Sequence, residues 1–214
     1  MSDVLARISE ELQNGKAKIV KQLVEDALAE GISAQNILTD GLMAGLDVIA
    51  VKFKNNEVYV PEMLVAARAM NMGTSTLKPY LIESGVKPIG KALLGTVKGD
   101  LHDIGKNLVK IMFEGKGIEV IDLGVDVPPE EFIRVQKDEN ADIIALSALL
   151  TTTMDEMKVT IDAFKDAGMR DDVIIMVGGA PVSESIKESS GADLYADDAA
   201  TAAELAMNAL TAKS

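Results

Sequence analysis

The only histidine of the chain, His102, stands between two aspartates, Asp100 and Asp103, in the stretch GTVKGDLHDIGKNLV. An aspartate that accepts a hydrogen bond from Nδ1–H fixes the imidazole tautomer and leaves Nε2 free to bind a metal. One histidine cannot hold a bare zinc or iron ion by itself. The pattern therefore indicates either a metal ligand that works with non-protein ligands or an ordinary hydrogen-bonded loop histidine.

Composition limits the kind of protein that can carry this histidine. The 214 residues are 48% hydrophobic, enough for one large or two small domains, and the formal net charge of −13 disfavours nucleic acid as a partner. The absence of cysteine excludes disulfides, thiolate metal sites and cysteine nucleophiles, and it suits a cytoplasmic protein. Apolar runs are too short for a membrane span, and the start shows no secretory signal.

The pattern of the chain changes near Glu83–Lys91, where Gly and Pro cluster. Before this stretch the apolar residues recur at helical spacing, with Gly31 as a helix stop, Ser33 as an N-cap and Pro61 at a helix start. We expect four helices that form a small bundle over residues 1–84 and a linker over 85–90.

After the linker, short β-rich runs alternate with amphipathic helices. Five such units predict a parallel sheet that is covered on both faces, an α/β domain over 91–214. The expected strands are 91–97, 118–124, 141–149, 172–179 and 192–196, and the expected helices lie near 104–115, 128–138, 154–166, 182–189 and 198–211.

The common order of such a sheet, 2-1-3-4-5, places a ligand crevice between the ends of the first and third strands. The loop after the first strand is KGDLHDIG, the third strand ends in LSALLTTT, and the fourth ends in VGGAP. These segments therefore converge on one crevice that contains His102. A histidine in this place, in a chain without cysteine, fits a tetrapyrrole-like metal better than a free ion.

Three pieces of the sequence together resemble the cobalamin-binding family. Asp100–Gly105 matches its D-x-H-x-x-G motif, Ser147–Leu149 matches S-x-L, and Gly178 with Gly179 match the paired glycines. The helical half resembles the cap of methionine synthase and of the corrinoid proteins of methyltransferase systems, with the cap's turn at Val58–Leu64. The resemblance covers nearly the whole chain, and it implies a four-helix cap followed by a five-stranded Rossmann-like, flavodoxin-like domain.

The resemblance also implies a role for each matching residue. His102 would be the lower cobalt ligand of a base-off/His-on cobalamin, Asp100 would hydrogen-bond it, and Thr153 would complete the relay, where methionine synthase has serine. For Ser147 and the threonines, a helix N-cap is the alternative reading. The cofactor-binding residues implied in this way are Asp100, His102, Asp103, Gly105, Ser147, Leu149, Thr151, Thr153, Gly178 and Gly179.

The resemblance implies a methyl carrier rather than a complete enzyme. A substrate-specific methyltransferase would place a methyl group on cob(I)alamin, and a second methyltransferase would pass it from methylcob(III)alamin to coenzyme M or tetrahydrofolate. A reductive activating protein would be a further partner. The methyl donor, which could be a methylamine, betaine, methanol or an aryl ether, is not encoded in any motif of the chain.

Other proteins of this topology fit less well. A phosphoacceptor receiver domain needs an aspartate where Ser147 stands and a lysine near Gly178, and a flavodoxin needs a phosphate loop and aromatic residues. A cobalamin-dependent mutase subunit usually lacks the helical half. The remaining alternative is a cobalamin-based sensor, which usually carries a DNA-binding module that this acidic chain does not show.

Overall fold

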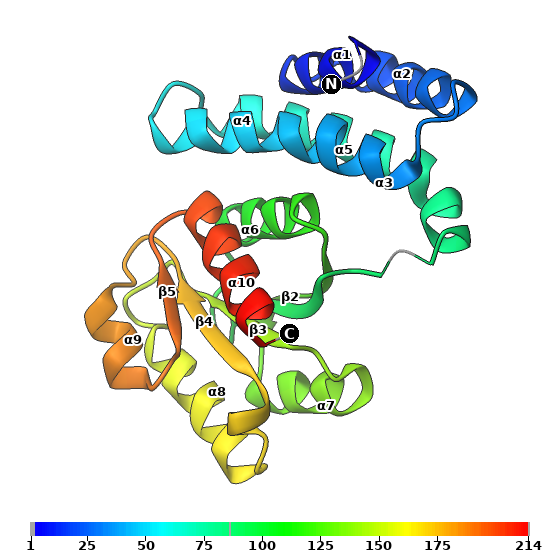
Figure 1. Ribbon diagram of the computed structural model, residues 1–214. Helices are drawn as coiled ribbons and strands as arrows, with labels where there is room; N and C mark the ends of the chain where they lie inside the picture. Colours follow the sequence, from blue (N-terminus) through cyan, green and yellow to red (C-terminus); the bar gives the residue numbers. More distant parts are fainter. Residues whose placement is uncertain (1–2, 86, 214) are drawn as a thin grey trace. The chain divides into compact units, whose positions relative to one another are not determined.

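The computed structural model describes residues 3–85 and 87–213. The chain forms two compact units, Met1–Lys87 and Pro88–Ser214, the first all helical and the second built on a sheet (Figure 1). Val86, inside the expected linker, lies outside the described residues, as do residues 1–2 and 214 at the ends of the two expected domains. Within the described ranges, no helix is both long enough and apolar enough to cross a membrane.

The first unit contains the four helices that the sequence predicts. The second predicted helix ends before Gly31, which has a φ of +80°, and Ser33 caps the third by accepting a hydrogen bond from the N–H of Asn36. The third helix differs from expectation, because its middle is wound as a π-helix. The elements are α1 (Asp3–Gln13), α2 (Ala17–Ala29), α3 (Ala34–Asn36), η1 (Ile37–Met43), α4 (Ala44–Lys54) and α5 (Val60–Glu83).

Small residues bring these helices close together. A Cβ on Gly73 of α5 would lie 2.6 Å from the Leu42 side chain, and one on Gly45 of α4 would lie 2.8 Å from the Ser9 carbonyl of α1. Met63 and Met70 are buried among the apolar residues of this unit. The helical unit therefore has a dense core of its own.

The second unit is a parallel sheet with the order β2-β1-β3-β4-β5, as the sequence predicts. Its strands begin and end within about three residues of the predicted bounds, and Gly90 already belongs to the first strand. The strands are β1 (Gly90–Val97), β2 (Ile118–Val127), β3 (Ile143–Ser147), β4 (Ile174–Gly178) and β5 (Leu194–Ala196). The helices are α6 (Ile104–Gly115), α7 (Pro129–Glu139), α8 (Asp155–Asp166), α9 (Glu184–Ser190) and α10 (Ala199–Lys213), with a 3-10 turn, η2, at Arg170–Asp172.

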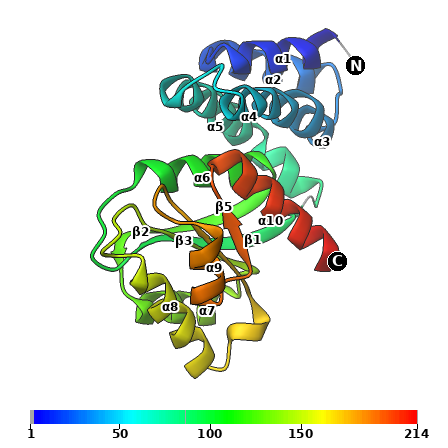
Figure 2. The same cartoon turned by 90° about the vertical axis from the view of Figure 1, so that its left-hand side faces the viewer.

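Helices cover both faces of this sheet. Helices α6 and α10 lie on one face, and α7, α8 and α9 lie on the other (Figures 1 and 2). The core under the second group includes Leu93 of β1, Ile144 of β3 and the fully buried rings of Phe132 and Phe164. This enclosure explains why the central strands read as nearly continuous apolar runs.

The pairing of β1 with β2 is irregular where the strands end. Leu94 pairs with Asp122, Gly95 with Gly124, and Val97 with Val127. Strand β2 thus advances from 122 to 127 while β1 advances from 94 to 97, so β2 holds two extra residues. Such bulges bend a strand and redirect its side chains.

We expect residues 88–214 to fold without the helical unit, because the sheet has a complete core of its own. The separate fragment should melt in one cooperative transition, followed by circular dichroism. A fragment that begins at residue 110 is the control, since it lacks the central strand β1 and should not fold. A gradual melt of the 88–214 fragment with dye-binding apolar surface would contradict the expectation.

Candidate functional site

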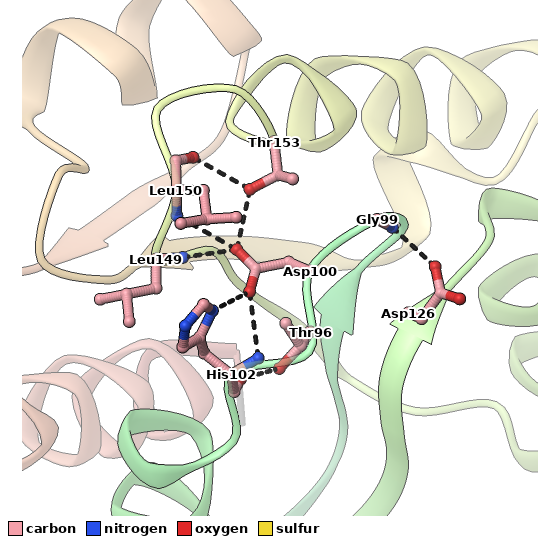
Figure 3. Close-up of polar contacts among 8 residues, drawn as sticks. All are labelled: Thr96, Gly99, Asp100, His102, Asp126, Leu149, Leu150 and Thr153. Carbon is pink, nitrogen blue, oxygen red and sulfur yellow. Dashed lines mark hydrogen bonds and ion pairs between the residues drawn. The ribbon is translucent and has the colours of Figure 1, made fainter.

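The site is organised around the carboxylate of Asp100, which follows β1 and is fully buried. Its Oδ1 accepts from the His102 backbone N–H at 3.1 Å and is 2.7 Å from His102 Nδ1. Its Oδ2 accepts from the N–H groups of Leu149 and Leu150 at 2.8 and 3.2 Å and from the Thr153 hydroxyl at 2.8 Å (Figure 3). A buried carboxylate with five donors is a fully satisfied polar group.

These hydrogen bonds determine the charge of Asp100. Burial of the carboxyl opposes ionisation, but the donated hydrogen bonds from Leu149, His102 and Thr153 outweigh it and hold the pKa of Asp100 well below its usual range. The residue is therefore an anion at any ordinary pH. An anion at Oδ1 favours the tautomer in which His102 carries its proton on Nδ1, and Nε2 keeps its lone pair.

His102 itself is only partly enclosed. About half of its side chain, 49%, is exposed, while its backbone carbonyl accepts from the buried Thr96 hydroxyl at 2.9 Å. Asp100 therefore holds the ring and Thr96 holds the backbone of His102, and Nε2 lies on the side of the ring away from Asp100 (Figure 3). An imidazole held in this way could bind a metal through Nε2.

Thr153 does not cap a helix. Helix α8 begins at Asp155 after Met154, whereas the Thr153 hydroxyl lies 2.8 Å from Asp100 Oδ2 and 2.9 Å from the Leu150 carbonyl. A hydroxyl has one proton, so it can donate to only one of these acceptors at a time. Thr153 thus joins Asp100 to the loop that follows β3.

Ser147 and Gly178 lie beside this network at the carboxyl edge of the sheet. Thr96 pairs with Ser147, and Ser147 pairs with Gly178, so the ends of β1, β3 and β4 are in register. Gly179 has a φ of +133°, and a Cβ there would lie 1.9 Å from the Ala148 carbonyl oxygen. Only glycine fits at residue 179, because the backbone of the neighbouring strand occupies the space of a side chain.

Three other residues from the sequence pattern stand outside the Asp100 network. Asp103 is exposed and accepts from the Asn107 side chain at 3.2 Å. Thr151 is exposed on the loop before α8. A Cβ on Gly105 would meet nothing within 4 Å, so this glycine borders open space.

Sequence reasoning missed three contributors to the site. Leu150 acts through its backbone N–H, Thr96 holds the carbonyl of His102, and Asp126 binds the N–H of Gly99 at 2.6 Å. A backbone donor leaves no trace in the residue type. Thr96 did leave a signal, because it is a polar residue inside an otherwise apolar strand end, whereas Asp126 lies beyond the strand expected at 118–124.

Apolar side chains are exposed in the same two loops that present the imidazole. Leu101 and Ile104 flank His102 in sequence, and Leu149 and Leu150 belong to the loop whose N–H groups hold Asp100; the four are 70%, 67%, 42% and 41% exposed. A flat, largely apolar group that meets Nε2 would cover such side chains. Among the described residues, no three His, Asp or Glu side chains form a cluster that could hold a metal ion.

Comparisons with known proteins show the family to which this chain belongs. A family described as B12 binding domain matches residues 90–210, and a second family with the same description matches residues 4–78. The chain therefore belongs to the B12-binding corrinoid proteins. Its expected sheet order and helical N-terminal half are those of the family.

Three relatives illustrate this membership. The dimethylamine corrinoid protein of Methanosarcina barkeri is 40% identical over 202 residues, which are 94% of each chain. A crystal structure of a cobalamin-binding protein from Desulfitobacterium hafniense is 30% identical, with a TM-score of 0.81 over 97% of this chain and 98% of that one. The methanol:cobalamin methyltransferase complex MtaBC from Methanosarcina barkeri contains a chain that is 27% identical, with a TM-score of 0.87 over 99% of this chain and 81% of that one.

The hydrogen bonds of Asp100 predict a specific pH dependence. Its pKa is lower in the folded chain than in the unfolded chain, so its contribution to stability is complete above the unfolded pKa of about 4 and is lost as the pH falls further. Asp100→Asn should lower the free energy of unfolding by about 3 kcal/mol near pH 7, because it removes the buried charge that the donors surround.

Urea unfolding of the cofactor-free chain between about pH 3 and pH 7 measures this difference. The gap between the wild type and Asp100→Asn should narrow as the pH falls below about 4. Asp103→Asn is the matched control, an exposed neighbour whose replacement should change stability by less than about 0.5 kcal/mol. A gap that stays constant down to pH 3 would show that the charge of Asp100 is not what stabilises the loop.

Proposed function

We propose that this chain is a corrinoid methyl carrier. It binds cobalamin in the base-off/His-on form, takes a methyl group from a substrate-specific methyltransferase and delivers it to a second methyltransferase that serves coenzyme M or tetrahydrofolate. The observation that carries the proposal is the half-exposed imidazole of His102, whose Nδ1 is held by a buried carboxylate, at the carboxyl edge of a B12-binding sheet.

His102 provides the lower ligand through Nε2. When bound, the corrinoid supplies a cobalt centre that can take up and release a methyl group. Asp100 keeps the proton of the imidazole on Nδ1, so the lone pair of Nε2 would be free to bind cobalt. The apolar side chains of Leu101, Ile104 and Leu149 are exposed and would be covered by the bound corrinoid.

The network also keeps a fixed negative charge beside His102. Burial opposes ionisation of Asp100, but its hydrogen bonds outweigh burial and hold its pKa well below its usual range. Thr153 supports the carboxylate as a hydrogen-bond donor. Asp100 would therefore remain an anion that orients the imidazole while the cofactor is bound.

The remaining pattern residues line the path of the displaced nucleotide tail in this proposal. Ser147 and Gly178 stand next to the network on β3 and β4, and Gly179 lets the β4 turn run against Ala148. Gly105 borders open space in the first turn of α6, and Thr151 is exposed on the loop after β3. Asp103 begins α6 on the exposed side of the same loop and would contact the cofactor's polar periphery.

The helical unit, residues 1–84 in this proposal, is the cap that shields the reactive face of the cofactor between visits of the two enzymes. Residues 91–214 bind the cofactor, and 85–90 link the two domains. A reductive activating protein is the third partner, because a corrinoid that is lost to oxidation must be reduced again. The relatives named for dimethylamine and methanol systems support methylated C1 compounds as the source of the methyl group.

The first functional test is the lower ligand. Reconstitution of the full chain with hydroxocobalamin should give equimolar cobalt and the absorption spectrum of a His-ligated, base-off form. His102→Ala should retain the fold, because a loop substitution makes no core cavity, and should show the spectrum of an unligated base-off form. Asn107→Ala, one helical turn further on, is the control and should keep the wild-type spectrum.

Two results would decide against the proposal. A His102→Ala protein with the wild-type spectrum would mean that another group binds cobalt. A wild-type protein that binds cobalamin but passes no methyl group, when it is incubated with methylamine or methanol methyltransferases and either acceptor enzyme, would favour the sensor alternative.

Charge predicts how the carrier meets its partners. The net charge of −13 attracts a complementary partner surface at long range, which speeds encounter without tight binding. The association rate with the cognate methyltransferase should therefore fall between about 20 and about 500 mM salt, where the Debye length shortens from roughly 20 to 4 Å. Stopped-flow absorption measures this rate, and a rate independent of salt would exclude charge steering.

A further inference from the structure

The two bulges of β2 place Asp126 next to the loop that carries the site. Because β2 holds two extra residues opposite Leu94–Val97, its end curls toward the turn between β1 and Asp100. Asp126 has a φ of +54°, a left-handed conformation that is uncommon for a residue other than glycine. Aspartate and asparagine tolerate this conformation better than other side chains.

In this conformation Asp126 binds two peptide groups, one on each side of the Gly99–Asp100 peptide bond. Its Oδ1 accepts from the Gly99 N–H at 2.6 Å, and its own N–H donates to the Asp100 carbonyl at 2.9 Å. Figure 3 shows the side chain of Asp126 reaching from the end of β2 toward Gly99. Asp126 therefore holds the backbone on either side of the Gly99–Asp100 peptide bond.

The turn that leads to Asp100 also contains a backbone hydrogen bond of its own. The Asp100 N–H donates to the Val97 carbonyl at 3.1 Å, which closes a four-residue turn. Lys98 and Gly99 are exposed, and Gly99 has a φ of +80°. The direction of the Asp100 side chain depends on this turn, and the position of its Oδ1 in turn selects the proton position of His102.

We propose that Asp126 is a positioning residue for the His102 ligand. By binding the backbone on both sides of the Gly99–Asp100 peptide bond, it orients the Asp100 carboxylate toward His102 Nδ1. The proton of the imidazole therefore stays on Nδ1, and Nε2 keeps the lone pair that can bind a metal. The importance of that tautomer for cobalt rests on the proposed function, whereas the coupling of Asp126 to His102 can be measured without any cofactor.

The test uses the full chain without cofactor and the nitrogen NMR signals of its only histidine. Asp126→Gly keeps the left-handed backbone but removes the carboxylate. The ratio of the Nδ1–H to the Nε2–H tautomer should fall by roughly three- to tenfold, the loss expected for one hydrogen bond. Asp126→Asn retains an acceptor oxygen and the same backbone preference, so it should restore most of the wild-type ratio.

A matched control comes from the other end of the sheet. Asn140 is also left-handed, with a φ of +49°, at the end of α7, and Asn140→Gly should leave the tautomer ratio unchanged. If Asp126→Gly does not fold, Asp126→Ser replaces it, because its hydroxyl is one atom too short to reach Gly99 and the same fall is expected.

A second measurement separates positioning from general stability. Hydrogen exchange of the Gly99 amide should accelerate in Asp126→Gly even if the residue only stabilises the strand end. The proposal is overturned if that amide exchanges faster while the tautomer ratio of His102 stays at the wild-type value, or if Asp126→Asn fails to restore the ratio. A wild-type chain that binds no cobalamin would refute the proposed function and leave this comparison intact.

After reconstitution with hydroxocobalamin, Asp126→Gly should bind as much cobalt as the wild type, because Asp126 lies outside the residues proposed to hold the cofactor. The fraction with His102 on the metal should fall, and Asp126→Asn should recover it. An unchanged ligated fraction in Asp126→Gly would also count against a positioning role.

Discussion

The ionised carboxylate of Asp100 connects the parts of this site that are distant in sequence. It follows β1, yet three of its five donors belong to the loop after β3, and its own backbone carbonyl binds the end of β2. A buried charge is tolerated only where donors surround it. The three strand ends must therefore keep their mutual positions, and the sheet order that places β1 between β2 and β3 is what allows one residue to contact both neighbours, through its side chain on one side and its carbonyl on the other.

Much of this arrangement can be predicted from the sequence, because it depends on side-chain patterns. The apolar runs at 91–97 and 141–149 predict buried parallel strands, and the order of such sheets brings His102 close to the loop that carries Thr153. The acids on either side of His102 indicate a carboxylate partner for the imidazole, and the family resemblance names Asp100 as that partner. These features are encoded by residue type and period, the two properties that a single sequence displays directly.

The features that escaped prediction depend on the backbone. Leu149 and Leu150 hold Asp100 through their N–H groups, which any residue but proline would supply. The bulges of β2 come from its pairing with β1, and the left-handed Asp126 follows from those bulges. The π-helical segment Ile37–Met43 likewise lies within a run of residues with ordinary helical spacing. Pairing register and helix winding are tertiary properties, so local patterns do not determine them.

The strength of the hydrogen bonds around Asp100 has a consequence for control of the site. Because its pKa is held well below the usual range, the residue does not change its charge at ordinary pH. What can vary is the geometry of the pair between Oδ1 and His102 Nδ1, and the access of other groups to Nε2. The geometry of this pair depends on the turn from Val97 to Asp100. A shift of that turn therefore alters the His102 ligand more readily than a change in the protonation of the carboxylate would. Asp126 contacts that turn from outside the Asp100 network. The orientation of the His102 ligand therefore depends on the position of the backbone as well as on acid–base chemistry.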